Sequence, residues 1–371
     1  MNEKYSIQST HTALKQKMID YISTVYLGKN DHLRLACDRE LKAVTTLYQT
    51  PYIEANQAYK VDKNGIANLE VPANQQVIKE TLTKLSKLGL GVFQNPYLHQ
   101  TNAIKAFAEG KDVFVATGTG SGKTECFMWP MVCKLIAEAT NNPKTWEKRG
   151  IRAMMLYPMN ALVSDQLGRL RKMIGDRDEK FQSLVKSISY ETRIPQFGMY
   201  TGRTAYPGSQ NEKKDKNLAQ TIYKDLINQF DKDTEPYEYT AKEKNISDLI
   251  KLGKYPAKKN VEEFAARLEL GEHFTHKLDA ELITRQEIRQ NCPDILITNY
   301  SMLQYMLIRP IEDCIWNNTK EWLVSDPNNK LLFIIDEAHM YRGSAGGEVA
   351  LLIRRFMHKL EIDRNRIQFI L

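Results

Sequence analysis

About a third of the way along this 371-residue chain, a short apolar strand runs into a glycine-rich loop and then into a helix. The segment Asp112–Thr124 reads Asp-Val-Phe-Val-Ala-Thr-Gly-Thr-Gly-Ser-Gly-Lys-Thr, and the helical pattern begins near Glu125. Three glycines at alternate positions let the backbone curl, so that successive N–H groups point into the loop. The following helix adds the partial positive charge of its N-terminus. A strand, loop and helix in this order predict a binding site for phosphate groups.

Each side chain of this loop has an expected role toward a bound triphosphate. Lys123 is expected to neutralise charge on the β- and γ-phosphates, and the Thr124 hydroxyl to bind Mg²⁺. The strict form of the motif has glycine where this chain has Thr117, so the loop departs from the pattern there. The alternative is a glycine-rich turn that holds no ligand. The residues expected to hold the nucleotide are Thr117, Gly118, Thr119, Gly120, Ser121, Gly122, Lys123 and Thr124.

From about residue 96 onward, short apolar runs alternate with helical stretches. Each run has roughly four to six residues and mostly lacks alternation, as expected of strands that are covered on both faces. Strands separated by helices imply a parallel, doubly wound α/β sheet. The predicted strands are Val113–Ala116, Ala153–Tyr157, Phe197–Tyr200, Ile295–Thr298, Leu331–Ile335 and Ile367–Leu371.

Two regions do not follow this alternation of strands and helices. Residues 1–95 are mainly helical in pattern and carry no chemical motif, so we interpret them as an accessory helical region that precedes a nucleotide-binding domain at 96–371. Residues 205–283 hold 28 charged residues in 79, and only Val261–Leu270 has a clear helical pattern. This stretch is predicted to be a charged insertion at a loop of the sheet. It either is solvated and functionally neutral or contacts a partner or a nucleic-acid strand.

Composition sets limits on the class of protein. The chain is 42% hydrophobic and 26% charged, which is ordinary for a globular protein, and no run of about 18 apolar residues predicts a membrane span. The first residues lack the apolar core of a secretory signal, and the five cysteines have no Cys-x-x-Cys spacing, so we expect a cytoplasmic protein with reduced thiols. Residues 100–204 carry 16 Lys and Arg against 10 Asp and Glu. This excess suits a polyanionic ligand, although a solvated surface would look the same.

A second group of polar residues follows a predicted strand. The segment Leu331–His339 reads Leu-Leu-Phe-Ile-Ile-Asp-Glu-Ala-His. Ligands of a parallel sheet collect at the carboxyl ends of its strands, so these residues are expected at the same edge as the phosphate loop. Asp336 is suited to hold Mg²⁺, and Glu337 to orient and deprotonate an attacking water. His339 is expected to couple the γ-phosphate to a neighbouring domain. Taken alone, the string could be a solvated helix start.

These two elements, in this order, resemble the superfamily 2 helicases of the DEAD/DEAH-box group, and the similarity extends over residues 96–371. The resemblance implies a first RecA-like domain, a parallel sheet with helices on both faces, that binds ATP and Mg²⁺. Pro96–Gln100 resembles the adenine-reading motif of the family, with Gln100 as the reader, because an amide can donate and accept hydrogen bonds together. A surface glutamine is the alternative.

Three further segments resemble the parts of the family that contact nucleic acid: Leu156–Gln166, Tyr200–Thr204 and Pro293–Leu303. Small hydroxyl and amide side chains at strand ends bind phosphates without reading bases. Each segment alone could be an ordinary turn. On this resemblance, the residues expected to contact nucleic acid are Asn160, Thr201, Arg203, Thr298 and Asn299.

Shorter phrases narrow the resemblance. The run Met340–Val349 and the Arg-Arg-bearing helix after it resemble the Lhr- and YprA-like branch. The phrases Tyr-Pro-Met-Asn-Ala-Leu and Thr-Asn-Tyr-Ser-Met-Leu are similar to large bacterial helicases of anti-phage defence clusters such as Druantia. Neither the family's Ser-Ala-Thr motif nor its second RecA-like domain, with an arginine finger, occurs before Leu371. We therefore expect a fragment or one subunit of a split motor, slow at ATP hydrolysis by itself.

The leading functional hypothesis is an ATP-dependent helicase or translocase that acts on DNA rather than RNA. Its expected partners are nucleic acid, a second RecA-like domain or subunit and other defence proteins, with no membrane. The second hypothesis is an ATP-gated nucleic-acid-binding clamp or scaffold that does not unwind autonomously. A kinase or GTPase is disfavoured, because the chain has no Asn-Lys-x-Asp guanine reader and the strand-contacting segments would have no explanation.

Overall fold

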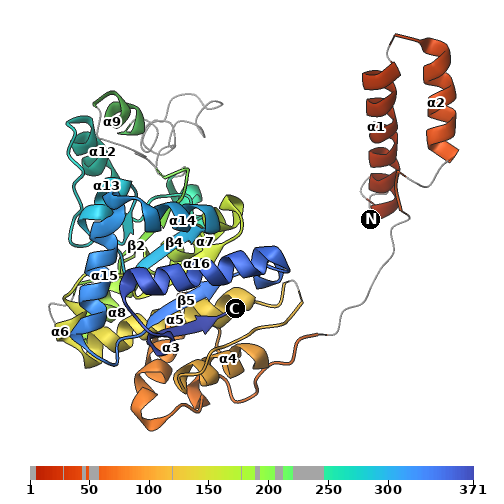
Figure 1. Ribbon diagram of the computed structural model, residues 1–371. Helices are drawn as coiled ribbons and strands as arrows, with labels where there is room; N and C mark the ends of the chain where they lie inside the picture. Colours follow the sequence, from red (N-terminus) through yellow and green to blue (C-terminus); the bar gives the residue numbers. More distant parts are fainter. Residues whose placement is uncertain are drawn as a thin grey trace. The chain divides into compact units, whose positions relative to one another are not determined.

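The computed structural model describes residues 6–27, 29–43, 47–49, 58–118, 120–176, 178–188, 193–204, 212–219 and 246–371. The chain divides into two compact units, Met1–Ala58 and Tyr59–Leu371. In the first unit, helices α1 (Ile7–Leu27) and α2 (Asp31–Ala43) pack side by side (Figure 1). Ile19 and Ser23 of α1 are buried between them. The helical character expected at the N-terminus is confirmed there.

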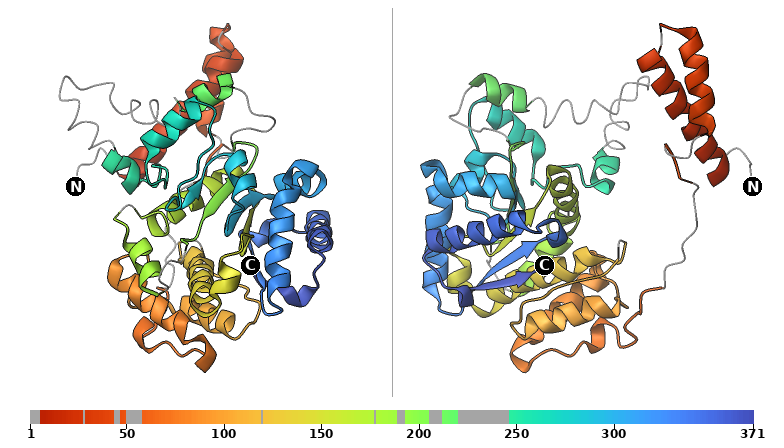
Figure 2. Two further views of the ribbon diagram at one scale, coloured as in Figure 1. Left: turned by 90° about the vertical axis from the view of Figure 1, so that its left-hand side faces the viewer. Right: turned by 45° about the vertical axis from the view of Figure 1, so that its right-hand side comes forward.

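The second unit is built on a six-stranded sheet in which all strands run parallel, in the order β3-β2-β4-β1-β5-β6 (Figures 1 and 2). Residues 113–115 lie beside β6 through hydrogen bonds such as Leu371 N–H to the Val113 carbonyl at 2.9 Å, but they form an isolated bridge and not a full strand. The strands are β1 (Ala153–Tyr157), β2 (Phe197–Tyr200), β3 (Glu281–Leu282), β4 (Ile295–Asn299), β5 (Leu331–Ile335) and β6 (Ile367–Ile370).

Helices cover both faces of this sheet (Figure 2). Alternate residues of the strands enter two separate hydrophobic cores, Met155 on one face and Met154 on the other. Because both faces are covered, the central strands are mostly apolar, and the predicted α/β fold class is confirmed. The first core includes side chains of α3 (Gln76–Leu88), α4 (Leu98–Ala108), α5 (Lys123–Asn141), α6 (Pro143–Trp146), α7 (Asn160–Met173) and α8 (Lys180–Ile188). The second includes side chains of α13 (Arg285–Gln290), α14 (Tyr300–Ile308), α15 (Asp313–Ser325) and α16 (Ser344–Leu360).

The sheet unit begins earlier than the sequence suggested. Residues 59–95, which the sequence assigned to an accessory region, belong to the same compact unit as the sheet. Ile78, Leu82 and Leu85 of α3 are buried in the core that also contains the strands. An apolar stripe of helical period looks the same whether it packs in a separate bundle or against a neighbouring sheet, so the boundary could not be located from the pattern.

The charged insertion also differs from its predicted extent of 205–283. Its last residues form β3, an edge strand that pairs with β2. Glu281 of that strand is buried because the Arg171 guanidinium contacts its carboxylate at 2.6 Å. The predicted helix is present as α12 (Val261–Glu269), and it packs against α9 (Glu212–Ala219). Residues 205–211 and 220–245 lie outside the described residues.

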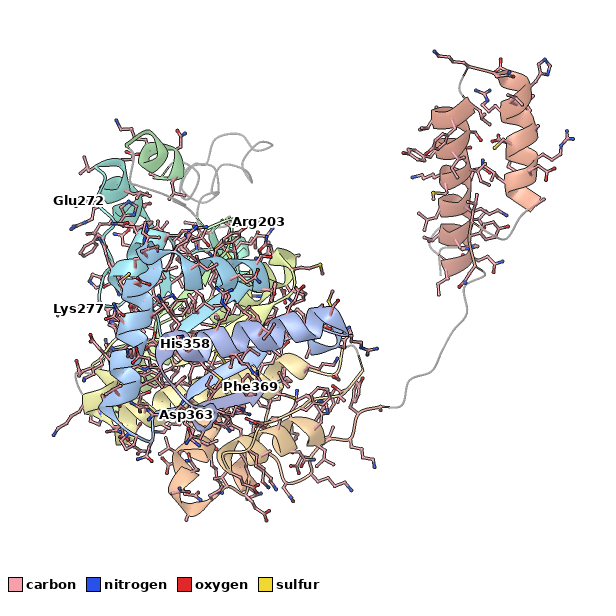
Figure 3. The ribbon with its side chains drawn as sticks, viewed as in Figure 1. Arg203, Glu272, Lys277, His358, Asp363 and Phe369 are labelled. Carbon is pink, nitrogen blue, oxygen red and sulfur yellow. The ribbon has the colours of Figure 1, made fainter. Side chains whose placement is uncertain are left out.

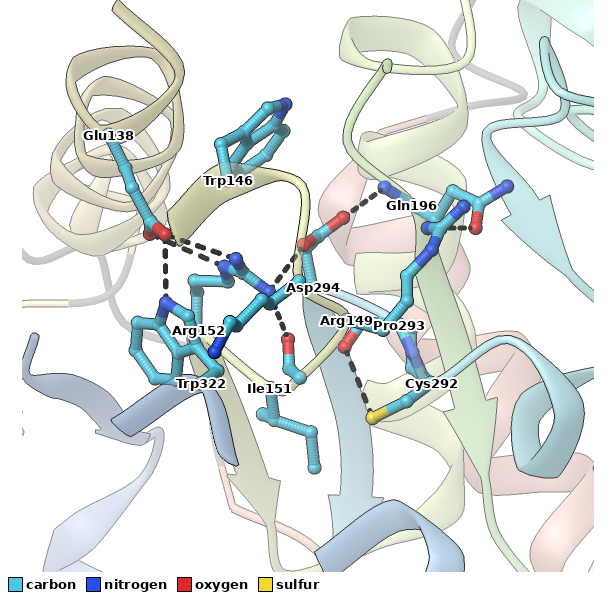
Figure 4. Close-up of polar contacts among 12 residues, drawn as sticks. Glu138, Trp146, Arg149, Ile151, Arg152, Gln196, Cys292, Pro293, Asp294 and Trp322 are labelled. Carbon is cyan, nitrogen blue, oxygen red and sulfur yellow. Dashed lines mark hydrogen bonds and ion pairs between the residues drawn. The ribbon is translucent and has the colours of Figure 1, made fainter. Parts of the chain in front are cut away.

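A network of buried ion pairs connects two neighbouring strands at the amino end of the sheet (Figure 4). The Arg152 guanidinium, which is fully buried, contacts the Glu138 carboxylate at 3.0 Å and the Asp294 carboxylate at 3.3 Å. Trp146 and Trp322 lie against the same guanidinium, with ring centroids 5.2 and 4.8 Å away. Arg152 directly precedes β1 and Asp294 directly precedes β4, so the network joins the starts of two central strands.

Short 3-10 turns connect several elements: Ile66–Asn68, Ala73–Gln75, Pro310–Glu312, Ala338–Met340 and Arg364–Arg366. Among the described residues, no helix has both the length and the apolar character that crossing a bilayer requires.

Candidate nucleotide and nucleic-acid site

Lys123, at the end of the glycine-rich loop, and the residues after β5 line one pocket of about 260 Å³ at the carboxyl edge of the sheet, whereas Thr124 lines a separate pocket beside α7. Lys123 enters the first pocket from the start of α5, while Asp336, Glu337 and His339 enter it from the turn that follows β5. The structure therefore brings together the basic and acidic residues that the sequence placed at this edge. Phe114 and Arg342, which the sequence did not single out as site residues, also line the pocket.

Gly122 is held in a conformation that only glycine adopts without strain. Its φ is +75°, and it immediately precedes the first residue of α5. A Cβ atom at this position would lie 2.5 Å from Gln100 Nε2 and 2.9 Å from Glu125 Oε2. Real Cβ atoms do not approach other atoms that closely, so the loop needs glycine here for both backbone and space.

Thr117, which departs from the strict motif, has a bond within the loop. Its hydroxyl lies 2.7 Å from the hydroxyl of Ser121, which is buried. A second contact joins His99 Nε2 to the Ser121 carbonyl at 2.9 Å. The substitution of threonine for glycine thus adds a side-chain hydrogen bond across the loop. Thr119 lies outside the described residues.

Gln100 lies beside the loop, but its amide is already engaged by the protein. Its Oε1 accepts a hydrogen bond from the Tyr97 N–H at 2.9 Å, and its Nε2 donates to the Gly122 carbonyl at 3.0 Å. The residue is only 2% exposed. Gln100 therefore ties the first turn of α4 to the last glycine of the loop. Its predicted role in reading adenine stays a prediction.

Asp336 is a partly buried carboxylate at the end of β5. Burial raises the pKa of Asp336, and the charge of Glu337 acts in the same direction. The Glu337 N–H, which donates to Asp336 Oδ1 at 2.8 Å, and the charge of Lys123 oppose these effects without cancelling them. A carboxylate that is short of compensating positive charge fits a divalent cation bound by one or two carboxylates together with phosphate oxygens. Thr124 stands half-buried in the first turn of α5.

The backbone at Glu337 turns sharply. Its φ is +52°, in the left-handed region that a non-glycine residue adopts at a cost of about 1–2 kcal/mol. The turn brings Glu337 Oε2 within 3.1 Å of His339 Nδ1. Both side chains are partly exposed, so the pair faces the open side of the pocket. Strain of this kind at a polar turn accompanies functional sites.

Of the five residues expected to contact nucleic acid, Asn160 and Asn299 lie together. Asn299 Nδ2 donates to Asn160 Oδ1 at 2.6 Å, which joins the start of α7 to the end of β4. Asn299 Oδ1 also accepts from the Met302 N–H at 2.8 Å and caps α14. Arg203 is exposed beyond the end of β2 (Figure 3). These three residues are at the carboxyl edge of the sheet.

Thr201 and Thr298 do not meet the expectation, because both are fully buried. The Thr298 hydroxyl donates to the Tyr200 carbonyl at 2.7 Å. The Thr201 hydroxyl accepts from the Arg203 N–H at 3.2 Å. Hydroxyl side chains at strand ends satisfy nearby backbone groups as readily as they bind an external ligand. In this structure both threonines stabilise the strand ends and offer no side-chain atom to a nucleic acid.

Residues 97–204 match the model of the DEAD/DEAH box helicase family. The chain is similar along its whole length to the Druantia protein DruE of Escherichia coli (strain UMEA 4076-1), with 37% identity over 394 aligned positions that cover 20% of that protein. The ATP-dependent helicase MJ1574 of Methanocaldococcus jannaschii is 29% identical over 74% of this chain and 25% of its own length. YprA of Bacillus subtilis is 28% identical over 32% of this chain and 14% of its own length.

A solved structure, the DUF1998 helicase MrfA bound to DNA and AMPPNP, matches 85% of this chain and 27% of that chain with a TM-score of 0.42 and 21% identity. The present chain spans a quarter or less of the length of the three sequence relatives. The sheet, the glycine-rich loop and the acidic turn define a nucleotide-binding domain of the RecA-like class. Within that class, residues 97–204 match the DEAD/DEAH box helicase family.

Proposed function

We propose that this chain binds ATP with Mg²⁺ and couples its hydrolysis to movement along nucleic acid, as the first motor domain of a helicase or translocase. The observation that carries the proposal is that Lys123 and the acidic pair Asp336 and Glu337 line one pocket although they are distant in sequence. Phosphoryl transfer needs mainly positioning and neutralisation of charge, which a lysine and a carboxylate-held cation supply together.

Each residue of the candidate site has a distinct task in this proposal. Lys123 would bind the phosphate oxygens, while Thr124 and Asp336 would hold a cation that neutralises developing charge. Glu337 orients the attacking water and accepts its proton. His339 contacts the Glu337 carboxylate at 3.1 Å and so limits the positions that this carboxylate can take. Gln100 maintains the loop through the Gly122 carbonyl.

We propose DNA as the nucleic acid, in line with the resemblance to large bacterial helicases of anti-phage defence and the similarity to a Druantia protein over the whole chain. Asn160, Asn299 and Arg203 are the described groups suited to contact its backbone, since amides and a guanidinium donate hydrogen bonds to phosphate. A second RecA-like domain or subunit would close on the pocket, and we expect the assembly in the cytoplasm.

The test is unwinding of a single-strand-tailed DNA duplex by the full-length protein that contains this chain. Lys123→Ala should abolish ATP-dependent unwinding, while Lys251→Ala, which removes an exposed lysine far from the pocket residues in sequence, should leave it unchanged. Undiminished unwinding by Lys123→Ala would refute the site assignment. ATP-dependent DNA binding without unwinding in the unmodified protein would instead identify an ATP-gated clamp. An RNA duplex tested in parallel decides between the two nucleic acids.

A further inference from the structure

Helix α7 reaches from the candidate nucleic-acid contact to the nucleotide loop. Its first residue, Asn160, is bonded to Asn299, as described above. Farther along the same helix, Arg169 Nη1 lies 3.2 Å from Glu125 Oε1. Glu125 directly follows Thr124 in the first turn of α5. One helix thus touches both sites, through Asn160 at its start and Arg169 about one turn before its end.

The Glu125 carboxylate is placed against the loop itself. While Oε1 faces Arg169, Oε2 is buried and has no hydrogen-bond partner. The same Oε2 is the atom that would lie 2.9 Å from a Cβ added to Gly122. The carboxylate thus lies close to the last glycine of the loop, whose carbonyl also accepts the hydrogen bond from Gln100.

A pocket lies beside the Arg169–Glu125 pair, between α5 and α7. It has a volume of about 310 Å³ and is lined in part by Thr124, Glu125, Met128, Trp129, Arg169 and Met173. Within the described parts of the chain, the Arg169–Glu125 pair is the one polar contact that joins side chains of these two helices. Away from this pocket, α5 and α7 share the first hydrophobic core through Phe127 of α5 and Leu167 and Leu170 of α7, so the pair lies at the solvent-facing edge of their contact.

The two partners of this pair differ in their exposure to solvent. The Arg169 side chain is 46% exposed, whereas the Glu125 side chain is 16% exposed. Arg169 therefore neutralises a mostly covered carboxylate next to Thr124 while its own side chain stays open to solvent.

We propose that the Arg169–Glu125 pair is a positioning contact through which nucleic acid bound at the Asn160 end of α7 changes the affinity of the loop for nucleotide. This inference rests on the proposed function. Coupling of this kind is reciprocal, so nucleotide also changes the affinity for nucleic acid by the same factor. Arg169 neutralises the Glu125 carboxylate beside the phosphate site, and a shift of α7 alters how completely it does so.

The experiment measures the dissociation constant of a fluorescent ATP analogue with Mg²⁺ for the full-length protein, without and with saturating single-stranded DNA. In the unmodified protein the ratio of the two constants is expected to be about fivefold or more, the lower end of typical coupling between sites. Arg169→Gln and Glu125→Gln should each bring the ratio close to one. Their thermal midpoints should stay near that of the unmodified protein.

Lys320→Gln is the matched control. Lys320 forms an ion pair with Glu361 at 2.5 Å and contacts neither α7 nor the loop, so its replacement should keep the full ratio. Full coupling in both Arg169→Gln and Glu125→Gln, or an equal loss in Lys320→Gln, would overturn the inference while the proposed function stands. A ratio of one in the unmodified protein, or no nucleotide binding at all, would overturn both.

Discussion

Removal of the Arg152 guanidinium should be one of the most damaging single changes to this fold. Arg152→Met keeps an unbranched apolar stem between Trp146 and Trp322 but deletes every polar contact of the guanidinium. Those contacts are the Glu138 and Asp294 carboxylates and the carbonyls of Gly150 and Thr145, the last two at 2.9 Å. Breaking a buried ion pair from one side costs about 3–5 kcal/mol, because a buried charge loses its partner.

The remaining contacts place the expected cost near the lower end of that range. Asp294 keeps the Arg193 guanidinium at 2.7 Å and the Gln196 N–H at 2.9 Å, while Glu138 keeps the Trp322 indole N–H at 2.8 Å. A loss of about 3 kcal/mol is a large part of the roughly 5–15 kcal/mol that stabilises a typical domain.

At roughly 2 °C per kcal/mol, the thermal midpoint should fall by about 6 °C. The assay is thermal and urea unfolding followed by tryptophan fluorescence. Lys251→Gln, which removes an ion pair with Asp248 whose side chains are 74% and 47% exposed, serves as the control and should cost less than about 1 kcal/mol. Equal stability of Arg152→Met and the unmodified protein would refute the role assigned to the network.

Two further predictions concern the nucleotide pocket. Gly122→Ala forces an L-residue into a φ of +75° and a Cβ against Gln100 Nε2, so the loop must shift. Its affinity for Mg²⁺-ATP should fall by about tenfold, or 1.4 kcal/mol, in a titration where Gly110→Ala, at a positive φ outside the loop, shows no loss. The pKa of Asp336 is raised in the folded protein. At any pH above the pKa that Asp336 has in the unfolded chain, ionisation of this carboxyl therefore favours unfolding. Asp336→Asn should therefore leave the thermal midpoint equal or higher at neutral pH while ATP hydrolysis is lost; a marked loss of stability would contradict this. In the unmodified protein, Mg²⁺-nucleotide affinity should fall as the pH drops through that raised pKa, a dependence that Asp336→Asn should remove.

Much of the fold could be predicted because the strands are covered on both faces. A strand buried on both sides is a short, unbroken apolar run, and the bounds of β1, β2 and β5 match their runs residue for residue. β3 has only two residues, and one is Glu281, whose burial depends on Arg171 from a distant helix. The residues around Glu281 in the sequence cannot predict its burial, because the arginine that neutralises it lies far away in the chain.

The candidate site could be located from sequence more fully than it could be described. The predicted ends of the strands indicated that Lys123 and Asp336 would lie close together, because parallel strands place their carboxyl ends at one edge of the sheet. The direction of a side chain at a strand end is set by its neighbours, so sequence could not distinguish exposed Arg203 from buried Thr201. Arg169 belongs to none of the sequence motifs. Its i, i+4 spacing from Asp165 predicts only an ordinary ion pair on the surface of a helix.

The central claim is that a triphosphate with its cation lies between the glycine-rich loop and the acidic turn after β5. The most direct measurement is an experimental structure of the protein with Mg²⁺ and a non-hydrolysable ATP analogue. We expect the β- and γ-phosphates within hydrogen-bonding distance of Lys123 Nζ, and the cation bound directly or through water to Asp336. A nucleotide seated elsewhere, or a cation bound away from both Thr124 and Asp336, would contradict the account.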